Sequence, residues 1–398
     1  MHSTPTFLFV LGRVTALAKS EFHHLLQRYA LSPKIVYEDT KIIIASFPIE
    51  PPLFWEEAGG LIRVARYQSS SSLVSLPHFL LSVSKEKKIT FGLSLVDGQK
   101  EKIHTIAAEV KDELEKQGNS VRYVLPEKNG YLSSVQVQRN KLLEHHSSVI
   151  LKEKKEKENS SDNYEIFVDE WVQPFEAFAQ RDYQRPYTDP KRGMLPPKVS
   201  RMMVNLALPK VPSKSYIVYD PFCGSGTILL EALNLGFDIL GSDIAKECVE
   251  GTRKNLDWLR RISPNEALKE EEIPQKIFQS DAVRIGERVG KAVDAIVTEP
   301  FLGRLFISPP TPGRAENTIK GLGKLYLGFF RVAKTVLKKE GRIAIIFPRI
   351  RSTTNVYTIP QGIISKIETL GYTLEEDPLL YDRPHAIVQR LIYIFGRV

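Results

Sequence analysis

Residues 298–301 read Thr-Glu-Pro-Phe and follow the apolar run 295–297, Ala-Ile-Val. The pattern predicts a buried strand that ends in a tight turn, where a carboxylate, Glu299, stands beside a rigid proline, Pro300, and a ring, Phe301. A base-modifying enzyme can use such a set, because an acceptor holds an exocyclic amine while a ring stacks on the extruded base. An ordinary strand-ending turn is the alternative.

A glycine-rich segment, YDPFCGSGTILLEALNLG from residue 219, predicts a nucleoside cofactor site at the end of another strand. Gly224 and Gly226 allow a tight turn and let a ligand approach the backbone closely. The helix expected from about Thr227 points its N-terminal amides at the same place. Asp243, at the end of the next strand, is placed to accept hydrogen bonds from a ribose diol.

The residues around this loop distinguish between cofactors. No Gly-Lys-Ser/Thr follows, so a phosphate-binding P-loop is not expected, and Leu229 stands where the dinucleotide fingerprint has its third glycine. Asp220, directly before the loop, would repel a pyrophosphate but suits a cofactor that carries a cationic amino group. The sequence therefore favours S-adenosylmethionine.

The charge of the chain indicates an anionic partner. The formal net charge is +8, and residues 303–351 contain eleven Lys and Arg against two acids. Residues 181–201 contain six basic residues and two acids. Arg304 and Arg314 are expected to contact RNA near the target base, because they follow the Glu299 turn closely. Part of the basic run must instead form the solvated face of a helix near 318–338.

Metal and membrane sites are not expected. Cys223 and Cys248 lack ligand spacing, and the histidine pairs at 23–24 and 145–146 lack acidic or cysteine partners. Cys223 is expected to be a packing residue of the loop. No apolar run is long enough to cross a membrane, and the first residues lack a secretory leader, so a cytoplasmic protein is expected.

The elements that must position these residues follow from the apolar pattern. After Pro212, apolar segments at 215–220, 237–243, 275–281, 292–299 and 341–348 alternate with helix-like or loop segments. Such alternation is typical of an α/β protein with a parallel, doubly wound, Rossmann-like sheet.

The pattern of the residues before Pro212 predicts two small α+β units. More than one domain is expected for a chain of 398 residues. In residues 1–80, a strand (6–13), a helix (16–29) and two paired strands (34–39, 41–47) are expected. In residues 81–175, the pattern predicts strands at 89–96, 120–126 and 164–171 and a helix at 102–118 that stops at Gly118. The charged segment 152–163 is expected to be a mobile loop or hairpin within this half, and residues 176–398, which contain the glycine loop and the Glu299 turn, to form the catalytic domain with the segment that precedes it.

Several of these segments carry a family resemblance. DPFCGSGTILLEA and the following GSD resemble the first two motifs of class I S-adenosylmethionine-dependent methyltransferases that act on exocyclic amines. RDYQRPYTDPKRGMLPPKVSRMMVNLA, from residue 181, resembles the segment before the catalytic domain in archaeal- and eukaryotic-type tRNA guanosine-10 N2-methyltransferases. Residues 1–80 are similar to that family's ferredoxin-like unit, and residues 81–175 occupy the place of its RNA-binding THUMP domain. YDRPHAIVQRLIYIF, from residue 381, is also similar to the family.

The resemblance implies S-adenosylmethionine as cofactor, tRNA or another structured RNA as partner, and no metal. It implies that Asp281 contacts the adenine amino group, with a helix-capping aspartate as the alternative. Met194, Pro196 and Pro197 are expected either to line the methionine end of the pocket or only to join domains. The expected cofactor-binding residues are Asp220, Phe222, Gly224, Gly226, Thr227, Asp243, Ile244, Asp281, Met194 and Pro196.

The catalytic turn departs from the family pattern (Asp/Asn)-Pro-Pro-(Tyr/Phe). Glu299 takes the place of the acid or amide, Pro300 matches the first proline, Phe301 replaces the second, and Leu302 stands where an aromatic residue is usual. Glutamate is longer by one methylene and still accepts a hydrogen bond from the guanine amine, with Phe301 as the stacking ring. The resemblance thus implies N2-methylation of a guanosine in tRNA. The alternatives are a methyltransferase of the same fold acting on ribosomal RNA or DNA, and a non-catalytic RNA-binding paralogue.

Overall fold

The computed structural model describes residues 4–71, 73, 75–84, 87–96, 100–127, 130–154, 164–189, 193–211, 213–263, 269–290, 292–383 and 385–398. The predicted loop at 152–163 lies largely outside these residues. The chain forms two compact units: unit 1 consists of Met1–Arg13, Leu31–Glu56 and Leu61–Glu176, and unit 2 of Val14–Ala30, Glu57–Gly60 and Ala177–Val398. In the described part of the chain no helix is long and apolar enough to cross a membrane.

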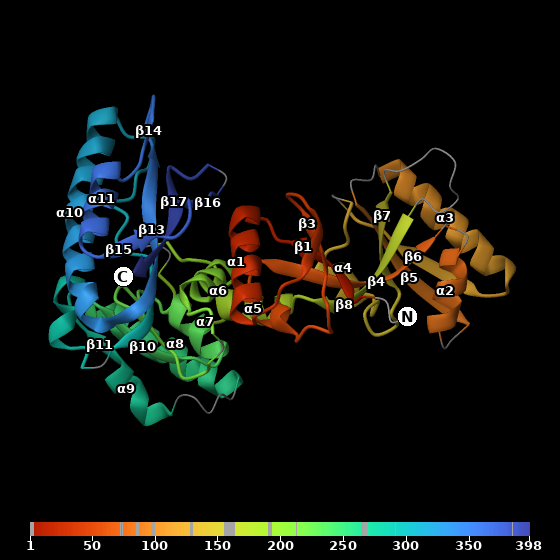
Figure 1. Cartoon of the computed structure of the whole chain (residues 1–398), viewed down its shortest axis with the longest axis horizontal. Helices are drawn as coiled ribbons and strands as arrows, with labels where there is room; N and C mark the ends of the chain where they lie inside the picture. Colours follow the sequence, from red (N-terminus) through yellow and green to blue (C-terminus); the bar gives the residue numbers. More distant parts are fainter. Residues whose placement is uncertain are drawn as a thin grey trace. The chain divides into compact units, whose positions relative to one another are not determined.

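Unit 1 is built on a mixed sheet, which has eight strands among the described residues in the order β2-β3-β1-β4-β8-β7-β5-β6 (Figure 1). The predicted pairing of the strands at 34–39 and 41–47 is confirmed, because β2 and β3 are antiparallel neighbours. Strand β5 runs parallel to β6 and β7, and the other neighbours are antiparallel. The strands are β1 (Thr6–Leu11), β2 (Lys34–Glu38), β3 (Ile42–Ser46), β4 (Leu61–Ser71), β5 (Lys88–Val96), β6 (Ser120–Val124), β7 (Ser148–Glu153) and β8 (Tyr164–Val172).

Helices α2 (Ser75–Val83) and α3 (Lys100–Lys116) cover the part of this sheet that contains β5. Buried side chains such as Leu80 and Ile106 pack there against Phe91. Helix α3 ends before Gly118, whose φ of +84° matches the predicted stop. The unit also contains the 3-10 turn η1 (Phe54–Glu57) at its boundary and the short helix α4 (Ser134–Arg139).

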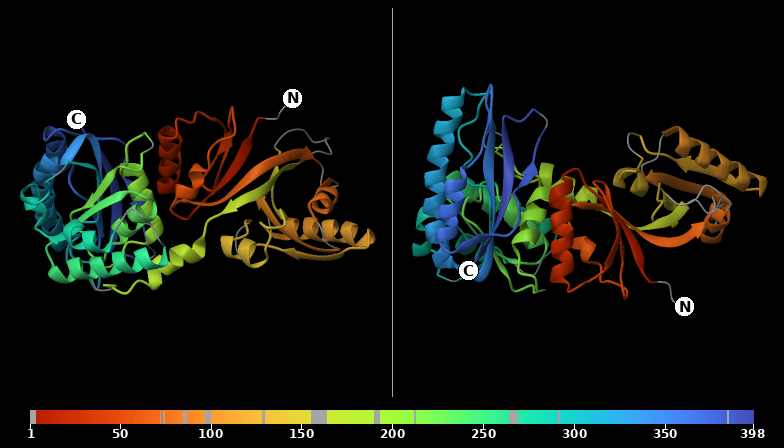
Figure 2. Two further views of the ribbon diagram at one scale, coloured as in Figure 1. Left: turned by 90° about the horizontal axis from the view of Figure 1, so that it is seen from below. Right: turned by 45° about the horizontal axis from the view of Figure 1, so that its top comes forward.

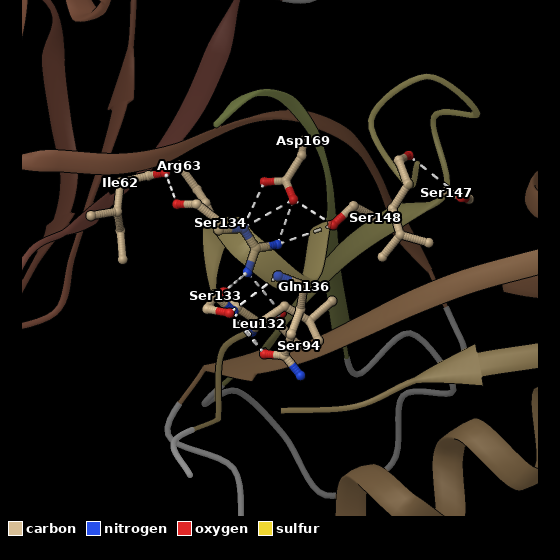
Figure 3. A network of polar contacts seen from close by, with 11 residues as sticks. Ile62, Arg63, Ser94, Leu132, Ser133, Ser134, Gln136, Ser147, Ser148 and Asp169 are labelled. Atoms are coloured by element: carbon tan, nitrogen blue, oxygen red, sulfur yellow. Dashed lines mark hydrogen bonds and ion pairs between the residues drawn. The ribbon is translucent and has the colours of Figure 1, made fainter. Parts of the chain in front are cut away.

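A buried ion pair ties several strands of unit 1 together (Figure 3). Arg63 of β4 and Asp169 of β8 are fully buried, and Arg63 Nη2 donates to Asp169 Oδ2 at 2.5 Å. Arg63 Nη1 also donates to Ser94 Oγ at 2.9 Å and to the Leu132 carbonyl at 3.1 Å. Because a buried guanidinium is tolerated only when its donors are satisfied, this network fixes β5 and the loop before α4 against β4.

Unit 2 is built on a second sheet, nine-stranded among the described residues, with the main order β11-β10-β9-β12-β13-β17-β15; β14 pairs with β13 and β16 with β17. Strands β9 to β13 are parallel, which confirms the predicted Rossmann-like sheet, whereas β17 is antiparallel to β13 and β15. The strands are β9 (Ile217–Asp220), β10 (Asp238–Asp243), β11 (Ile277–Gln279), β12 (Val293–Thr298), β13 (Leu337–Arg351), β14 (Val356–Tyr357), β15 (Tyr372–Leu374), β16 (Leu379–Tyr381) and β17 (Val388–Arg397).

The strand order reverses between β9 and β12, and such a switch point opens a crevice at the carboxyl ends of the strands. Helices α10 (Pro312–Val336) and α11 (Gln361–Thr369) pack on one face of the sheet (Figures 1 and 2), where the Tyr326 ring stacks on Phe347 and the Phe330 ring contacts Phe395. Helix α6 contacts β12 and β13, and α7 contacts β9 and β10. The helices are α5 (Phe175–Tyr183), α6 (Pro197–Ala207), α7 (Thr227–Asn234), α8 (Lys246–Ile262), α9 (Ile273–Lys276), α10 (Pro312–Val336) and α11 (Gln361–Thr369), with 3-10 turns η2 (Glu270–Glu272) and η3 (Ala282–Glu287).

Helix α1 (Thr15–Arg28) belongs to unit 2. Its Glu21 is fully buried and accepts hydrogen bonds from the amides of Gly59 and Gly60 at 2.8 and 2.7 Å and from Asn205 Nδ2 of α6 at 2.7 Å. The strands expected in residues 1–80 and 81–175 thus share one sheet, while the helix expected at 16–29 packs with the C-terminal half.

Candidate active site

A cavity of about 650 Å³ lies in unit 2 at the carboxyl ends of β9, β10 and β12. Residues predicted from two separate sequence patterns line it together. The turn after β12 contributes Glu299, Pro300, Phe301 and Arg304. The predicted cofactor residues that also line it are Met194, Asp220, Phe222, Gly224, Thr227, Asp243, Ile244 and Asp281.

The glycine loop between β9 and α7 has a backbone that other residues adopt rarely. Gly224 and Gly226 have φ of +53° and +79°. A Cβ on Gly226 would also lie 2.8 Å from Cγ2 of Thr252, so this glycine is required by packing although it does not line the cavity. Helix α7 begins at Thr227, as the sequence predicts, and Arg185 donates to the Thr227 hydroxyl.

Asp220 ends β9 and is 1% exposed. Its Oδ1 accepts hydrogen bonds from Thr298 Oγ1 at 2.7 Å and from the Phe222 amide at 3.1 Å. Burial raises the pKa of the Asp220 carboxyl to about 7, and the nearby carboxylates of Asp243 and Glu299 add to that increase. A positively charged ligand in the cavity would favour the ionised form of this carboxyl.

The ends of the next two strands supply further acceptors. Asp243 Oδ2 accepts from the Gly224 amide at 3.0 Å, so this side chain fixes the glycine loop while it lines the cavity. Ile244 beside it is 66% exposed. Asp281 Oδ1 accepts from the Val283 amide at 3.1 Å and caps η3. Both interpretations of Asp281 therefore fit, because the capping side chain also lines the cavity.

The carboxylate of Glu299 makes an ion pair that the sequence did not predict. Arg390 of β17 donates from Nε to Glu299 Oε1 at 2.5 Å, and the two side chains are 11% and 16% exposed. The ring of Phe301 is 57% exposed, while its carbonyl accepts a hydrogen bond of 2.8 Å from the Tyr326 hydroxyl. The turn thus holds the acid inward and leaves the ring accessible.

The segment before α6 closes the cavity from another side. The Met194 carbonyl accepts a hydrogen bond from Arg383 Nη2 at 2.8 Å, and the sulfur of the Met194 side chain lies 3.0 Å from Arg185 Nη2. Pro196 is the N-cap of α6 and does not line the cavity. Arg383 and Arg390 both do, and both were missed as site residues. Only the family-like segment from residue 381 contained a signal for them.

The two predicted RNA-contacting arginines are exposed but differ in position. Arg304 lines the cavity, whereas Arg314 does not and lies over the Phe306 ring at 5.2 Å. Leu305 and Ile307, between them, are strongly exposed. The rim after the Glu299 turn therefore combines apolar side chains with guanidinium groups.

Two further expectations concern metals and the loop cysteine. Among the described residues, no group of three His, Cys, Asp or Glu side chains is arranged to hold a metal ion. Burial raises the pKa of the Cys223 thiol, and its sulfur accepts a contact from Thr252 Oγ1 at 3.6 Å. Cys223 thus packs within the loop, and it also lines the cavity.

Comparison with known proteins finds similar sequences. Residues 184–362 match the family model of an RMKL-like methyltransferase domain, and residues 71–254 match a DNA methylase model. The chain is 36% identical over 168 residues to the tRNA (guanine(10)-N2)-dimethyltransferase of Methanothermobacter thermautotrophicus and 31% identical over 212 residues to that of Pyrococcus abyssi. These alignments cover 42% and 53% of this chain and 42% and 52% of the relatives, so the chain spans about half the length of those curated relatives.

A shorter relative is covered more completely. The probable tRNA (guanine(10)-N2)-dimethyltransferase of Methanothermococcus thermolithotrophicus is 31% identical over 154 residues, which are 80% of that protein and 38% of this chain. Among solved structures, TrmN from Thermus thermophilus aligns with 99% of this chain and 100% of its own, with a TM-score of 0.54 at 15% identity. That similarity shows a shared fold.

Proposed function

The chain belongs to the tRNA guanine(10)-N2-methyltransferase family, and from that membership we propose that it methylates the N2 amine of a guanosine in tRNA, with S-adenosylmethionine as methyl donor. One observation carries the proposal: the glycine loop with its acids and the Glu299 turn line the same cavity. The hydrogen bond between Thr298 and Asp220 supports this, because it joins the strand ends that carry the two sets.

The residues of the cavity fit S-adenosylmethionine. Asp220, whose pKa is raised to about 7 by burial, favours a cationic neighbour, as the sulfonium and amino group provide. The proposed roles are Asp243 and Ile244 at the ribose, Asp281 and Phe222 at the adenine side, and Met194 with Arg383 at the methionine end. Gly224, Gly226 and Thr227 shape the backbone loop, and Pro196 holds the start of α6. When bound, the cofactor supplies an electrophilic methyl group.

The chain's own contribution to catalysis is acceptance of the amine and positioning. The N2 lone pair is delocalised into the purine ring, and an acceptor that takes a hydrogen bond from the amine returns electron density to the nitrogen. Glu299 is that acceptor, and Pro300 fixes the turn. Phe301 stacks on the base, which its 57% exposure allows. Holding the amine in line with the methyl group accounts for most of the expected acceleration.

Two features support RNA as the partner: the exposed residues that follow the Glu299 turn, and the N-terminal half of the chain. Arg304 and Arg314 are placed to contact phosphates near the target base, with the apolar side chains of Leu305 and Ile307 between them. We propose that the strands of residues 1–80 form a ferredoxin-like part and residues 81–175 a THUMP-like RNA-binding part of the one sheet of unit 1, and that residues 176–398 form the catalytic domain, with which α1 packs. The protein is proposed to act in the cytoplasm, without a metal.

The test is incubation with labelled S-adenosylmethionine and separate pools of unmodified tRNA, ribosomal RNA and DNA, followed by nucleoside mass spectrometry. N2-methylguanosine or N2,N2-dimethylguanosine, formed in tRNA alone, is expected. Label in DNA would favour the alternative to which the DNA methylase match points. Binding of cofactor and tRNA without transfer would indicate a non-catalytic RNA-binding paralogue.

A further inference from the structure

We propose that Glu299 and Arg390 act as one recognition unit that admits guanine to the cavity and rejects purines with a donor at position 6. The inference rests on the proposed function, since it specifies how the same site selects its base. It adds Arg390 to the site as a specificity-determining residue.

The two residues come from different strands of one sheet. Glu299 directly follows β12 and Arg390 lies on β17, and β13 separates these strands in the sheet. Both side chains line the cavity and are largely buried. Their contact is side-on, through the Nε side of the guanidinium: Arg390 Nε donates to Glu299 Oε1 at 2.5 Å. Among the described residues this is the one hydrogen bond that either side chain makes.

This geometry leaves an acceptor and a set of donors side by side. Glu299 Oε2 has capacity for a hydrogen bond, and the two terminal nitrogens of Arg390 retain their N–H groups. The Watson–Crick edge of guanine presents donors at N1 and N2 next to an acceptor at O6. Guanine therefore pairs its N2 amine with Oε2 of Glu299 and its O6 with Arg390. Adenine has no N2 amine and directs a donor at the arginine.

The pair also explains why a glutamate suits this position. An isolated buried carboxylate carries a large desolvation cost, whereas the ion pair with Arg390 is neutral overall, as is the base it would meet. The side chain of Glu299 spans the distance to Arg390 from the turn. The planar guanidinium binds Glu299 through Nε and keeps its outer N–H groups for the ligand, which a lysine ammonium does not reproduce.

The experiment compares two bases that both carry the N2 amine. The target guanosine of a synthetic tRNA is replaced by 2,6-diaminopurine riboside, which differs at position 6 and in the protonation of N1. Single-turnover methyl transfer is measured at saturating S-adenosylmethionine and RNA. The wild type should prefer guanosine by about 100-fold or more, because an unpaired donor facing Arg390 leaves both groups unsatisfied.

Arg390→Gln is the test variant, since a glutamine amide offers an acceptor as well as a donor. It should slow transfer to guanosine and reduce the preference for guanosine about 10-fold or more. Arg351→Gln is the matched control: Arg351 lies on β13, pairs with Asp382, and does not line the cavity. It should leave rate and preference unchanged. Calorimetric binding of S-adenosylmethionine, expected to be unaffected in both variants, checks that each is folded.

Two outcomes overturn the inference and leave the proposed function intact. One is equal transfer to both bases by the wild type. The other is an Arg390→Gln variant that is slower on guanosine but keeps the full preference, which would indicate that the ion pair only holds the turn in place. If the wild type methylates neither base, the proposed function itself fails, and the inference fails with it.

Discussion

Thr298 donates a hydrogen bond of 2.7 Å from its Oγ1 to Oδ1 of Asp220, and both side chains are buried. Thr298 is the last residue of β12 and Asp220 the last residue of β9, so the bond joins two neighbouring parallel strands at their carboxyl ends. The bond thereby links Asp220, which is proposed to lie near the cationic groups of the cofactor, to the turn that contains Glu299.

Asp220→Ala should weaken binding of S-adenosylmethionine by about 1–3 kcal/mol, the usual effect of losing a charge-assisted hydrogen bond. Because burial raises the pKa of Asp220 to about 7 and a cationic ligand favours the carboxylate, wild-type affinity should fall as the pH drops from 8 to 6. Calorimetry in buffers of different ionisation enthalpy should detect proton release on binding. Affinity that is independent of pH in this range would argue against the assigned charge contact.

The same carboxyl should make the stability of the ligand-free protein depend on pH. A pKa raised from 3.8 to about 7 means that the stability contributed by protonated Asp220 is full below about 3.8 and is lost as the pH rises through 7. Asp220→Asn stays neutral, so its stability relative to wild type should be greater at pH 8 than at pH 5, by about 1–3 kcal/mol. Urea unfolding at both pH values measures this difference. A constant difference would contradict the raised pKa.

Substitutions of Glu299 should separate chemistry from binding. Glu299→Ala should slow single-turnover methyl transfer by about 10²–10⁴-fold, the range typical of a positioned acid–base group, while cofactor affinity stays nearly unchanged. Glu299→Gln keeps one acceptor oxygen without the charge and should be less impaired. Glu299→Asp, one methylene shorter, should lose the contact with Arg390 and reach the amine poorly. Wild-type rates in the alanine variant would mean that another group accepts the amine.

Arg304 and Arg314 should contribute to the salt dependence of tRNA binding. Each phosphate contact by Lys or Arg releases about one counterion, so the Arg304→Ala/Arg314→Ala double variant should have a salt slope for tRNA binding that is smaller by about 2. A matched double variant on the outer surface of α10, Lys320→Ala/Lys324→Ala, should change the slope less. Titrations of tRNA binding between low and physiological salt measure both. Identical slopes for wild type and the arginine variant would exclude these arginines from the interface.

Phe301 should act mainly on placement of the base. Phe301→Ala removes a stacking surface worth about 1–3 kcal/mol, whereas Phe301→Trp retains one. The alanine variant should therefore need a higher RNA concentration for half-maximal single-turnover rate, and the tryptophan variant should remain close to wild type. The check is the RNA concentration dependence of that rate at saturating cofactor. A similar defect in both variants would favour a packing role for the ring in the turn.

The local parts of this site are encoded by residues that are neighbours along the chain. Apolar runs predicted the strands that end at Asp220, Asp243 and Thr298, because strand formation and burial are encoded by neighbouring residues. The backbone at Gly224 and Gly226 has positive φ values, which glycine adopts easily because it has no Cβ. The start of α7 at Thr227 and the stop of α3 before Gly118 were predicted for the same local reasons.

Which distant residues come into contact depends on how the whole chain folds. Arg390 and Glu299 are 91 residues apart, and their contact depends on the antiparallel insertion of β17 beside β13, which no local pattern encodes. The packing of α1 with unit 2 likewise rests on Glu21 reaching Gly59, Gly60 and Asn205. The raised pKa of Asp220 arises from burial by the assembled sheet and loop. Strand order, register and desolvation are properties of the folded chain as a whole. They bring the guanidinium of Arg390 into contact with the carboxylate of Glu299, for which the sequence predicted no partner.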